Sequence, residues 1–151
     1  MRNTHRLLAV LLVSGAVAAP VAAQAQAQSR IITGRGSATL SNAVRVGDLV
    51  FASGALPSGG ANADTTIEGQ TTSTLENIKR TLETAGTSIN HAVKCTVYLI
   101  EGADFRGMNT AYTKFWSAEN PPPARTTVVV KALVVPSAKL EIECIAAMPK
   151  P

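Results

Sequence analysis

The spacing of apolar residues along the chain switches between the two-residue repeat of β-strands and the longer repeat of helices. Short runs that alternate with polar residues, or that are rich in β-branched residues, predict strands. Gly47 and Asp48 separate the first two runs and suit a tight hairpin turn. The strands are expected at residues 43–46, 49–53, 93–99, 126–130 and 140–146.

Two segments show helical spacing instead. In residues 65–85 the apolar side chains fall on one side, and Thr65 with Glu68 has the form of a capping box at the start. Asp104 is placed to cap a second helix, which has to end before the prolines at 121–123. The inward-facing residues are expected to be Ile67, Leu75, Ile78 and Leu82 in the first helix, and Phe105, Met108, Tyr112 and Phe115 in the second.

These elements follow one another in the order ββαβαββ, which predicts a fold of the α+β class. Crossovers between parallel strands are right-handed in nearly all proteins, so both helices are expected on one face of a mixed sheet. The strand at 126–130 is apolar on both of its faces, and a single helical layer covers only one of them. We therefore expect a second subunit on the open face, in a dimer or a trimer.

The first residues have the three parts of a secretory signal peptide: a basic start, an apolar run and a segment of small residues. The apolar run at 7–19 has about 13 residues, fewer than the roughly 20 needed to cross a bilayer. We expect cleavage after Ala23 or Ala25 and release into the periplasm or the medium, with no membrane attachment; a retained N-terminal anchor is the alternative. The predicted parts are a signal peptide at 1–23, a flexible N-terminal arm at 24–36 and one domain at 37–147.

Charge and cysteine content narrow the classes of partner. Arg2 and Arg6 lie in the leader; removing them from the 14 basic residues leaves 12 against 10 acidic residues. The remaining basic residues are scattered, so we expect no nucleic-acid partner. Cys95 and Cys144 each lie inside a predicted strand, where buried free thiols are expected rather than a disulfide. The chain after the leader has one histidine and no Cys-x-x-Cys, so we expect no metal site.

Arg125 and Glu141 are the candidate chemical groups. Arg125 starts an apolar strand, where its guanidinium fork is well placed to hold a small carboxylate through two hydrogen bonds. Glu141 and Glu143 point away from the apolar side of the last strand. Arginine and glutamate are also common on exposed surfaces without any function, but a second subunit would enclose them here. On what we take to be neighbouring strands, they predict a site for a small acid.

Several motifs in order along the chain resemble the RidA/YjgF reactive-intermediate deaminase family, and together they extend over about residues 37–147. The motifs are ASGALP at 52–57, LENIKRTLETAG at 75–86, VKCTVYL at 93–99, DFRGMNTAYTKFW at 104–116, PPARTTV at 122–128 and LEIECIA at 140–146. The resemblance implies a chorismate-mutase-like fold, a homotrimer and a site in each cleft between subunits.

The same resemblance implies an activity and a set of site residues. Family members hydrolyse 2-imino and 2-enamino acids to 2-keto acids and ammonia without a cofactor. Arg125 corresponds to the arginine that holds the substrate carboxylate, and Glu141 to the glutamate that positions and activates water. Gly54 and Thr127 correspond to positions that offer backbone N–H groups to the ligand. Asn109 corresponds to an asparagine near the cleft.

Leu40 departs from the family pattern, because active members commonly carry a tyrosine at the corresponding position. A leucine can pack on an apolar substrate side chain, but it cannot donate a hydrogen bond. Two functions therefore stay open: hydrolytic deamination in an inter-subunit cleft, and a trimeric module that binds small carboxylates without turnover. An endoribonuclease activity, which older descriptions attach to the family, has little support in the scattered basic residues.

Overall fold

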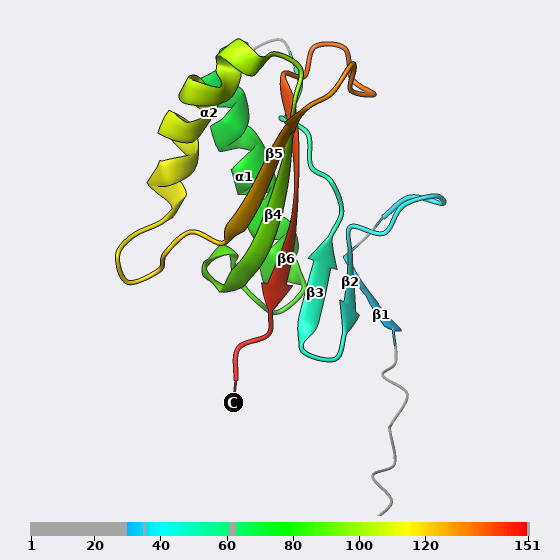
Figure 1. The fold of residues 1–151 in the computed structure, drawn as a ribbon. Helices are drawn as coiled ribbons and strands as arrows, with labels where there is room; N and C mark the ends of the chain where they lie inside the picture. The colour runs from blue at the N-terminus through cyan, green and yellow to red at the C-terminus, as the bar shows by residue number, and fades with distance from the viewer. Residues whose placement is uncertain (1–29, 35, 61–62, 151) are drawn as a thin grey trace, which may run out of the picture.

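The computed structural model describes residues 30–34, 36–60 and 63–150. They form one six-stranded sheet and two α-helices (Figure 1). The predicted signal peptide and its cleavage site lie outside the described residues. In this part of the chain, no helix combines the length and the apolar character needed to span a membrane.

The sheet is mixed, with the strand order β1-β2-β3-β6-β4-β5. β4 and β5 are parallel, and every other neighbouring pair is antiparallel. The strands are β1 (Arg30–Thr33), β2 (Ala43–Val46), β3 (Leu49–Ala52), β4 (Ala92–Leu99), β5 (Ala124–Val129) and β6 (Leu140–Ala147); the α-helices are α1 (Ile67–Thr84) and α2 (Phe105–Tyr112), and short 3₁₀ turns cover Ile89–His91, Gly102–Asp104 and Thr113–Phe115. The predicted α+β class and the order ββαβαββ from β2 onward are confirmed.

β1 is an addition to the predicted fold, because its residues belong to the segment expected to be a loose arm at 24–36. It pairs with β2 in an antiparallel register from Arg30 opposite Val46 to Thr33 opposite Ala43. Backbone hydrogen bonds rather than burial hold this strand, and its large apolar side chains stay about half exposed. A strand of this kind leaves no alternating pattern in the sequence.

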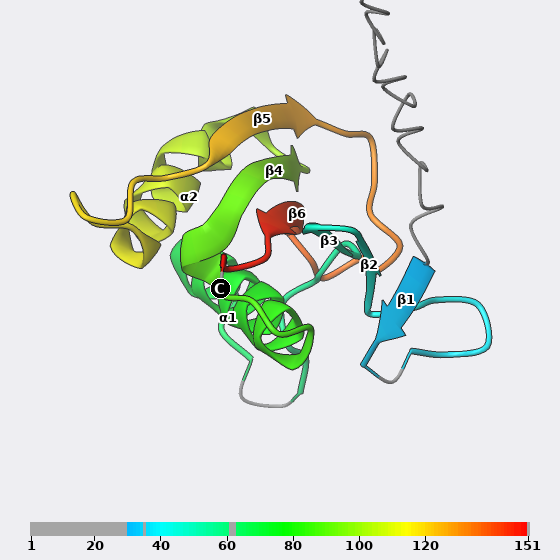
Figure 2. The same ribbon diagram turned by 90° about the horizontal axis from the view of Figure 1, so that it is seen from below.

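Both helices lie on one face of the sheet, as predicted (Figure 2). The four residues predicted to face inward from α1 are all buried, against the apolar side of β6 and β4. α1 begins one residue later than the capping box suggested: Thr66 is the N-cap, and its hydroxyl accepts the Gly69 N–H. In α2, Met108 and Tyr112 are buried, whereas Phe105, at the exposed first position, is not.

Cys95 and Cys144 form a disulfide, contrary to the expectation of free thiols. The two residues are directly opposite in the β4–β6 pair, with Cα atoms 4.2 Å apart. Such close opposite pairs occur at the non-hydrogen-bonded positions of antiparallel strands. The sequence prediction lacked the strand order, which brings the last strand beside β4 rather than beside β5.

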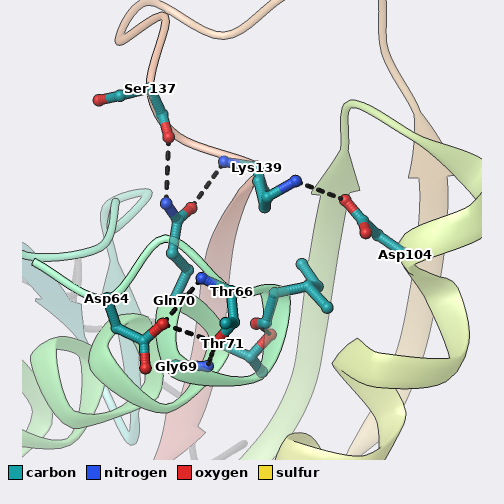
Figure 3. A network of polar contacts seen from close by, with 9 residues as sticks. Asp64, Thr66, Gly69, Gln70, Thr71, Asp104, Ser137 and Lys139 are labelled. Atoms are coloured by element: carbon teal, nitrogen blue, oxygen red, sulfur yellow. Dashed lines mark hydrogen bonds and ion pairs between the residues drawn. The ribbon is translucent and has the colours of Figure 1, made fainter.

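A buried glutamine fixes the turn that leads into β6 (Figure 3). Gln70 of α1 donates from Nε2 to the Ser137 carbonyl at 3.0 Å, and its Oε1 accepts the Lys139 N–H at 2.7 Å. Lys139 Nζ also lies 3.5 Å from Asp104 Oδ2, at the start of α2. Asp104 was predicted to cap α2 with its side chain; it occupies the cap position, but makes no capping hydrogen bond. The network ties both helices to the turn before β6.

Candidate functional site

Arg125 is the second residue of β5, and its side chain lies on the helix side of the sheet. It is in register with Cys95 of β4, whose side chain is buried in the core. The guanidinium carbon lies 4.6 Å from the centre of the Tyr112 ring and 5.9 Å from that of Phe105. Nη1 is 3.8 Å from the Met108 sulfur, a weak acceptor. Cation–π contacts therefore hold the guanidinium in place and leave its strong hydrogen-bonding capacity unused.

Within the described residues, Arg125 has no carboxylate at ion-pair distance; the two pairs found are Lys79 with Glu76 and Lys139 with Asp104. A partly buried guanidinium without an acidic partner has the electrostatics of an anion site. Among the described residues, no acidic side chain competes for the Arg125 guanidinium.

Arg125 stands at the edge of a hollow of about 560 Å³ between α2 and the proline segment that leads into β5. We call it the aromatic hollow; its main lining residues are Asn109, Tyr112, Trp116, Pro122, Pro123 and Arg125. Asn109, predicted near the cleft, therefore lies in the same group as Arg125. Burial raises the pKa of Tyr112 to about 12, with the charge of Arg125 acting in the opposite direction. The phenol of Tyr112 is therefore neutral beside the guanidinium at physiological pH.

Thr127 belongs to the same group, two residues beyond Arg125. Its side chain is on the helix side, in register with Val97, and its buried hydroxyl has no hydrogen-bond partner among the described residues. The Val130 N–H bonds the Leu99 carbonyl of β4, so alternation along β5 turns the Thr127 N–H to the other side. β5 is the edge strand, and that N–H is therefore on its open edge.

Glu141 and Gly54 form a second group. Glu141 is opposite Tyr98 in the β4–β6 pair and lies on the face of the sheet away from the helices. Ala55 and Ile142 bond one another's backbone at 2.8 and 3.0 Å, which brings Gly54 beside Glu141. A Cβ atom on residue 54 would overlap Oε1 of Glu141, so the carboxylate lies directly over the glycine.

Leu40 belongs with this second group. It lies in the loop before β2 and is 53% exposed. The carbonyl of the next residue, Ser41, accepts a hydrogen bond from Ser53 Oγ at 2.7 Å, and Ser53 directly precedes Gly54. The loop that carries Leu40 is thus fastened to the segment that carries Gly54.

Glu143 has a partner of its own on the same face as Glu141. Tyr98 donates its hydroxyl to Glu143 Oε1 at 3.1 Å. This hydrogen bond is the main cause that raises the pKa of Tyr98 above its usual value. Glu143 is engaged in this pair, whereas Glu141 has no hydrogen bond to a described side chain, which leaves its carboxylate available for chemistry.

The predicted site residues therefore fall into two groups on opposite faces of the sheet. Arg125, Asn109 and Thr127 are in one group, and Glu141 and Gly54 are in the other; the loop that carries Leu40 is fastened to the Gly54 segment. The expectation that Arg125 and Glu141 come from neighbouring strands is wrong, because β4 lies between β5 and β6. A single chain does not bring the two side chains together.

Sequence reasoning missed two residues of the aromatic hollow. Tyr112 was taken as a core residue, and the role of Trp116 was not considered, since both fit the apolar pattern of a helix. Their rings lie 5.7 Å apart, and Tyr112 Oη and Trp116 Nε1 are buried without a hydrogen-bond partner in the described part of the chain. The three prolines just before Arg125 were the only sequence signal of a rigid wall at this place.

The described part of the chain contains no group of three or more His, Cys, Asp or Glu side chains close enough to hold a metal ion.

Comparison with known proteins gives consistent matches over this domain. A family model described as "Endoribonuclease L-PSP" matches residues 34–148. The chain is 40% identical over 111 residues to Reactive Intermediate Deaminase A, chloroplastic, of Arabidopsis thaliana, covering 72% of this chain and 58% of that protein. It thus spans less than two thirds of that relative. It is also 41% identical over 109 residues to a RutC family protein of Sinorhizobium fredii, covering 70% of this chain and 83% of that one.

Solved structures show the same fold. A member of the YjgF protein family from Neisseria meningitidis superposes with a TM-score of 0.74 and 27% identity, over 83% of this chain and 99% of that one. A protein of the Rid family from Yersinia pestis superposes with a TM-score of 0.73 and 29% identity, over 80% and 100% of the two chains.

Proposed function

The chain belongs to the RidA/YjgF/L-PSP family, and on this basis we propose that it hydrolyses 2-imino and 2-enamino acids to 2-keto acids and ammonia. The observation that carries the proposal is the state of Arg125. Its guanidinium is fixed over Tyr112 at 4.6 Å, lines a hollow and has no acidic partner among the described residues. This arrangement suits the carboxylate that every 2-imino acid carries.

The active site is formed between two copies of the chain, in a homotrimer. Support comes from the separation of the two groups of residues on opposite faces of the sheet. Large apolar side chains on the strands around the second group are also exposed, Phe51 at 43% and Val128 at 40%. Contact between copies would cover these side chains and bring Glu141 of one copy to Arg125 of the next.

The residues have complementary roles in the reaction. Arg125 binds the substrate carboxylate, and the Thr127 N–H on the open edge of β5 adds a donor. Glu141 takes a proton from water as the water oxygen attacks the protonated imine carbon. In the amino-alcohol that results, Glu141 returns this proton to nitrogen. The C–N bond then breaks and ammonia leaves, while the hydroxyl proton passes back to Glu141 and the carbonyl of the keto acid forms. Holding the two reactants in place supplies much of the rate gain.

Leu40 favours a second candidate, a trimer that binds small carboxylates without turnover. Leucine at this position has no hydroxyl to bond a water or an imine nitrogen. The residues proposed to bind the carboxylate, those grouped with Arg125, are nevertheless all present. Binding and turnover measured on the same protein separate the two candidates.

The proposed activity is tested by release of keto acid from freshly generated 2-imino acids. Arg125→Ala is expected to lower kcat/KM by about 100-fold or more, because two charge-assisted hydrogen bonds are lost. Arg106→Ala is the matched control, since Arg106 is an exposed arginine of α2 that does not line the aromatic hollow. Equal rates for the wild type and Arg125→Ala contradict the proposal. Binding of 2-ketobutyrate without turnover selects the binding module.

Export to an oxidising compartment belongs to the same proposal. The N-terminal pattern of a signal peptide and the disulfide between Cys95 and Cys144 support it, because such bridges persist mainly outside the cytosol. N-terminal sequencing of the protein from its native host is the test. An intact Met1 contradicts export with cleavage.

A further inference from the structure

The aromatic hollow is larger than a small imino acid needs. It is open to one side, and its volume of about 560 Å³ in the single chain is of the size that holds whole organic ligands. The side chain of an imino acid derived from alanine is a single methyl group, which would leave most of this space unfilled. The size of the hollow therefore bears on which substrate the site takes.

The walls of the hollow are flat and apolar. Trp116 supplies a partly exposed aromatic ring. The ring of Tyr112 lies behind it, with centres 5.7 Å apart, but is 3% exposed and carries the Arg125 guanidinium. Pro122 and Pro123 also line the hollow, and their rings fix the backbone there. Walls of this kind favour a planar apolar group, which can pack against the indole of Trp116.

Charge is confined to one rim. Arg125 is the only cation among the residues that line the hollow, whereas Asn109, Thr113 and Ser117 are neutral polar residues. A ligand with a carboxylate at one end and an apolar body at the other matches this distribution. The carboxylate meets the guanidinium, and the apolar body enters the space between the aromatic and proline walls.

We infer that the aromatic hollow receives the substrate side chain, and that the chain acts preferentially on 2-imino acids with an aryl side chain. This inference rests on the proposed function, because it takes Arg125 as the carboxylate anchor. Trp116, Pro122 and Pro123 then determine specificity, whereas Arg125 and Glu141 serve every substrate. Burial of about 60 Å² of additional apolar surface corresponds to roughly tenfold tighter binding.

The test is calorimetry on the assembled protein with phenylpyruvate, pyruvate and 2-ketobutyrate, the products of three substrates that differ only in the side chain. Phenylpyruvate is expected to bind at least about tenfold more tightly than pyruvate. Imine turnover measured in parallel should show the same preference in KM.

Variants test the role of the aromatic hollow separately from that of Arg125. Thr113 lines the hollow and is exposed, so Thr113→Trp fills the space from outside the core. We expect this variant to lose the preference for phenylpyruvate over pyruvate. Thr110→Trp is the matched control, an exposed threonine one turn earlier in α2 that does not line the hollow. Trp116→Leu removes one aromatic wall and should reduce the same preference, with circular dichroism as a check of folding.

The outcomes distinguish the inference from the function on which it rests. If pyruvate binds as tightly as phenylpyruvate, or if Thr113→Trp and Trp116→Leu keep the preference, the inference is overturned and the deaminase function stands. If no keto acid binds and Arg125→Ala leaves turnover unchanged, both are overturned.

Discussion

Gly54 lies directly under the carboxylate of Glu141, so closely that a Cβ atom at residue 54 would overlap Glu141 Oε1 and lie 3.0 Å from its Cδ. The backbone of Gly54 is not in the left-handed region, so the glycine is required here for space and not for its conformational freedom. The first prediction follows from this contact. Gly54→Ala displaces the end of a flexible side chain, which costs little stability but moves the carboxylate away from the reacting water.

Gly54→Ala should lower turnover by roughly 100-fold, since a displacement of about 1 Å has effects of that size. Its melting temperature should stay close to that of the wild type. Gly59→Ala is the control, because a Cβ atom at residue 59 meets nothing within 4 Å. Full activity in Gly54→Ala would show that the position of the Glu141 carboxylate does not matter.

The second prediction concerns the two groups of site residues on opposite faces of the sheet. Arg125→Ala and Glu141→Gln should each be inactive alone. When the two variants are mixed by refolding together, about a quarter of the sites in random mixed trimers receive both native residues. Activity should therefore return to about a quarter of the wild-type level. If the site lay within one chain, every chain in the mixture would keep one defect and no activity would return.

The amphipathic elements could be predicted from the sequence because each buries one regular face. Leu75 and Ile78 of α1, and Ile142 of β6, are fully buried where the periodicity placed them. β1 could not be predicted in this way, since it is held by backbone pairing with little burial. Val93 has the same two-residue spacing as the buried Cys95, Val97 and Leu99, but a bulge between Ala92 and Lys94 shifts the register and leaves it exposed.

The candidate site could be predicted only residue by residue. Periodicity indicates which face of its own strand a side chain occupies, and this was right for Glu141. It does not indicate which strands are neighbours, because strand order depends on contacts distant in sequence. The position of β4 between β5 and β6 both separates Arg125 from Glu141 and joins Cys95 to Cys144. The strand order therefore explains both differences between the sequence prediction and the structure.

The third prediction concerns the disulfide, which closes a separation of 49 residues between β4 and β6. Constraint of the unfolded chain by a loop of this size should contribute about 2–4 kcal/mol to the free energy of unfolding. Addition of a reductant should therefore lower the melting temperature of the wild type, whereas a variant with both Cys95→Ala and Cys144→Ala should not respond. Alkylation of the denatured, unreduced protein checks the bridge: two labelled cysteines would contradict it.

The fourth prediction is a loss of stability at high pH through Tyr112. Burial raises its pKa from 10.0 to about 12 in the folded protein, so the unfolded chain releases the proton first. Stability from this group is complete below about pH 10 and is lost as the pH rises through about 12, by up to about 2–3 kcal/mol. Urea denaturation at increasing pH should show a smaller decline for Tyr112→Phe. An equal decline in both proteins would contradict the assignment. So would tyrosinate absorbance that rises near pH 10 in folded Tyr98→Phe, in which Tyr112 is the one remaining tyrosine.

The last prediction concerns Gln70, whose amide bonds the backbone on both sides of the buried Ala138. Gln70→Leu keeps a similar volume but leaves the Ser137 carbonyl and the Lys139 N–H without these partners. An unpaired buried polar group costs about 1–3 kcal/mol, so we expect a loss of about 2–4 kcal/mol in the free energy of unfolding.

Turnover of Gln70→Leu, measured well below its melting temperature, should also fall. Lys139 lies two residues before Glu141, and the start of β6 is no longer fixed in this variant. Glu83→Gln, an exposed substitution in the same helix, should change neither quantity. If Gln70→Leu kept wild-type stability in urea denaturation, the network in Figure 3 would not be what holds this turn.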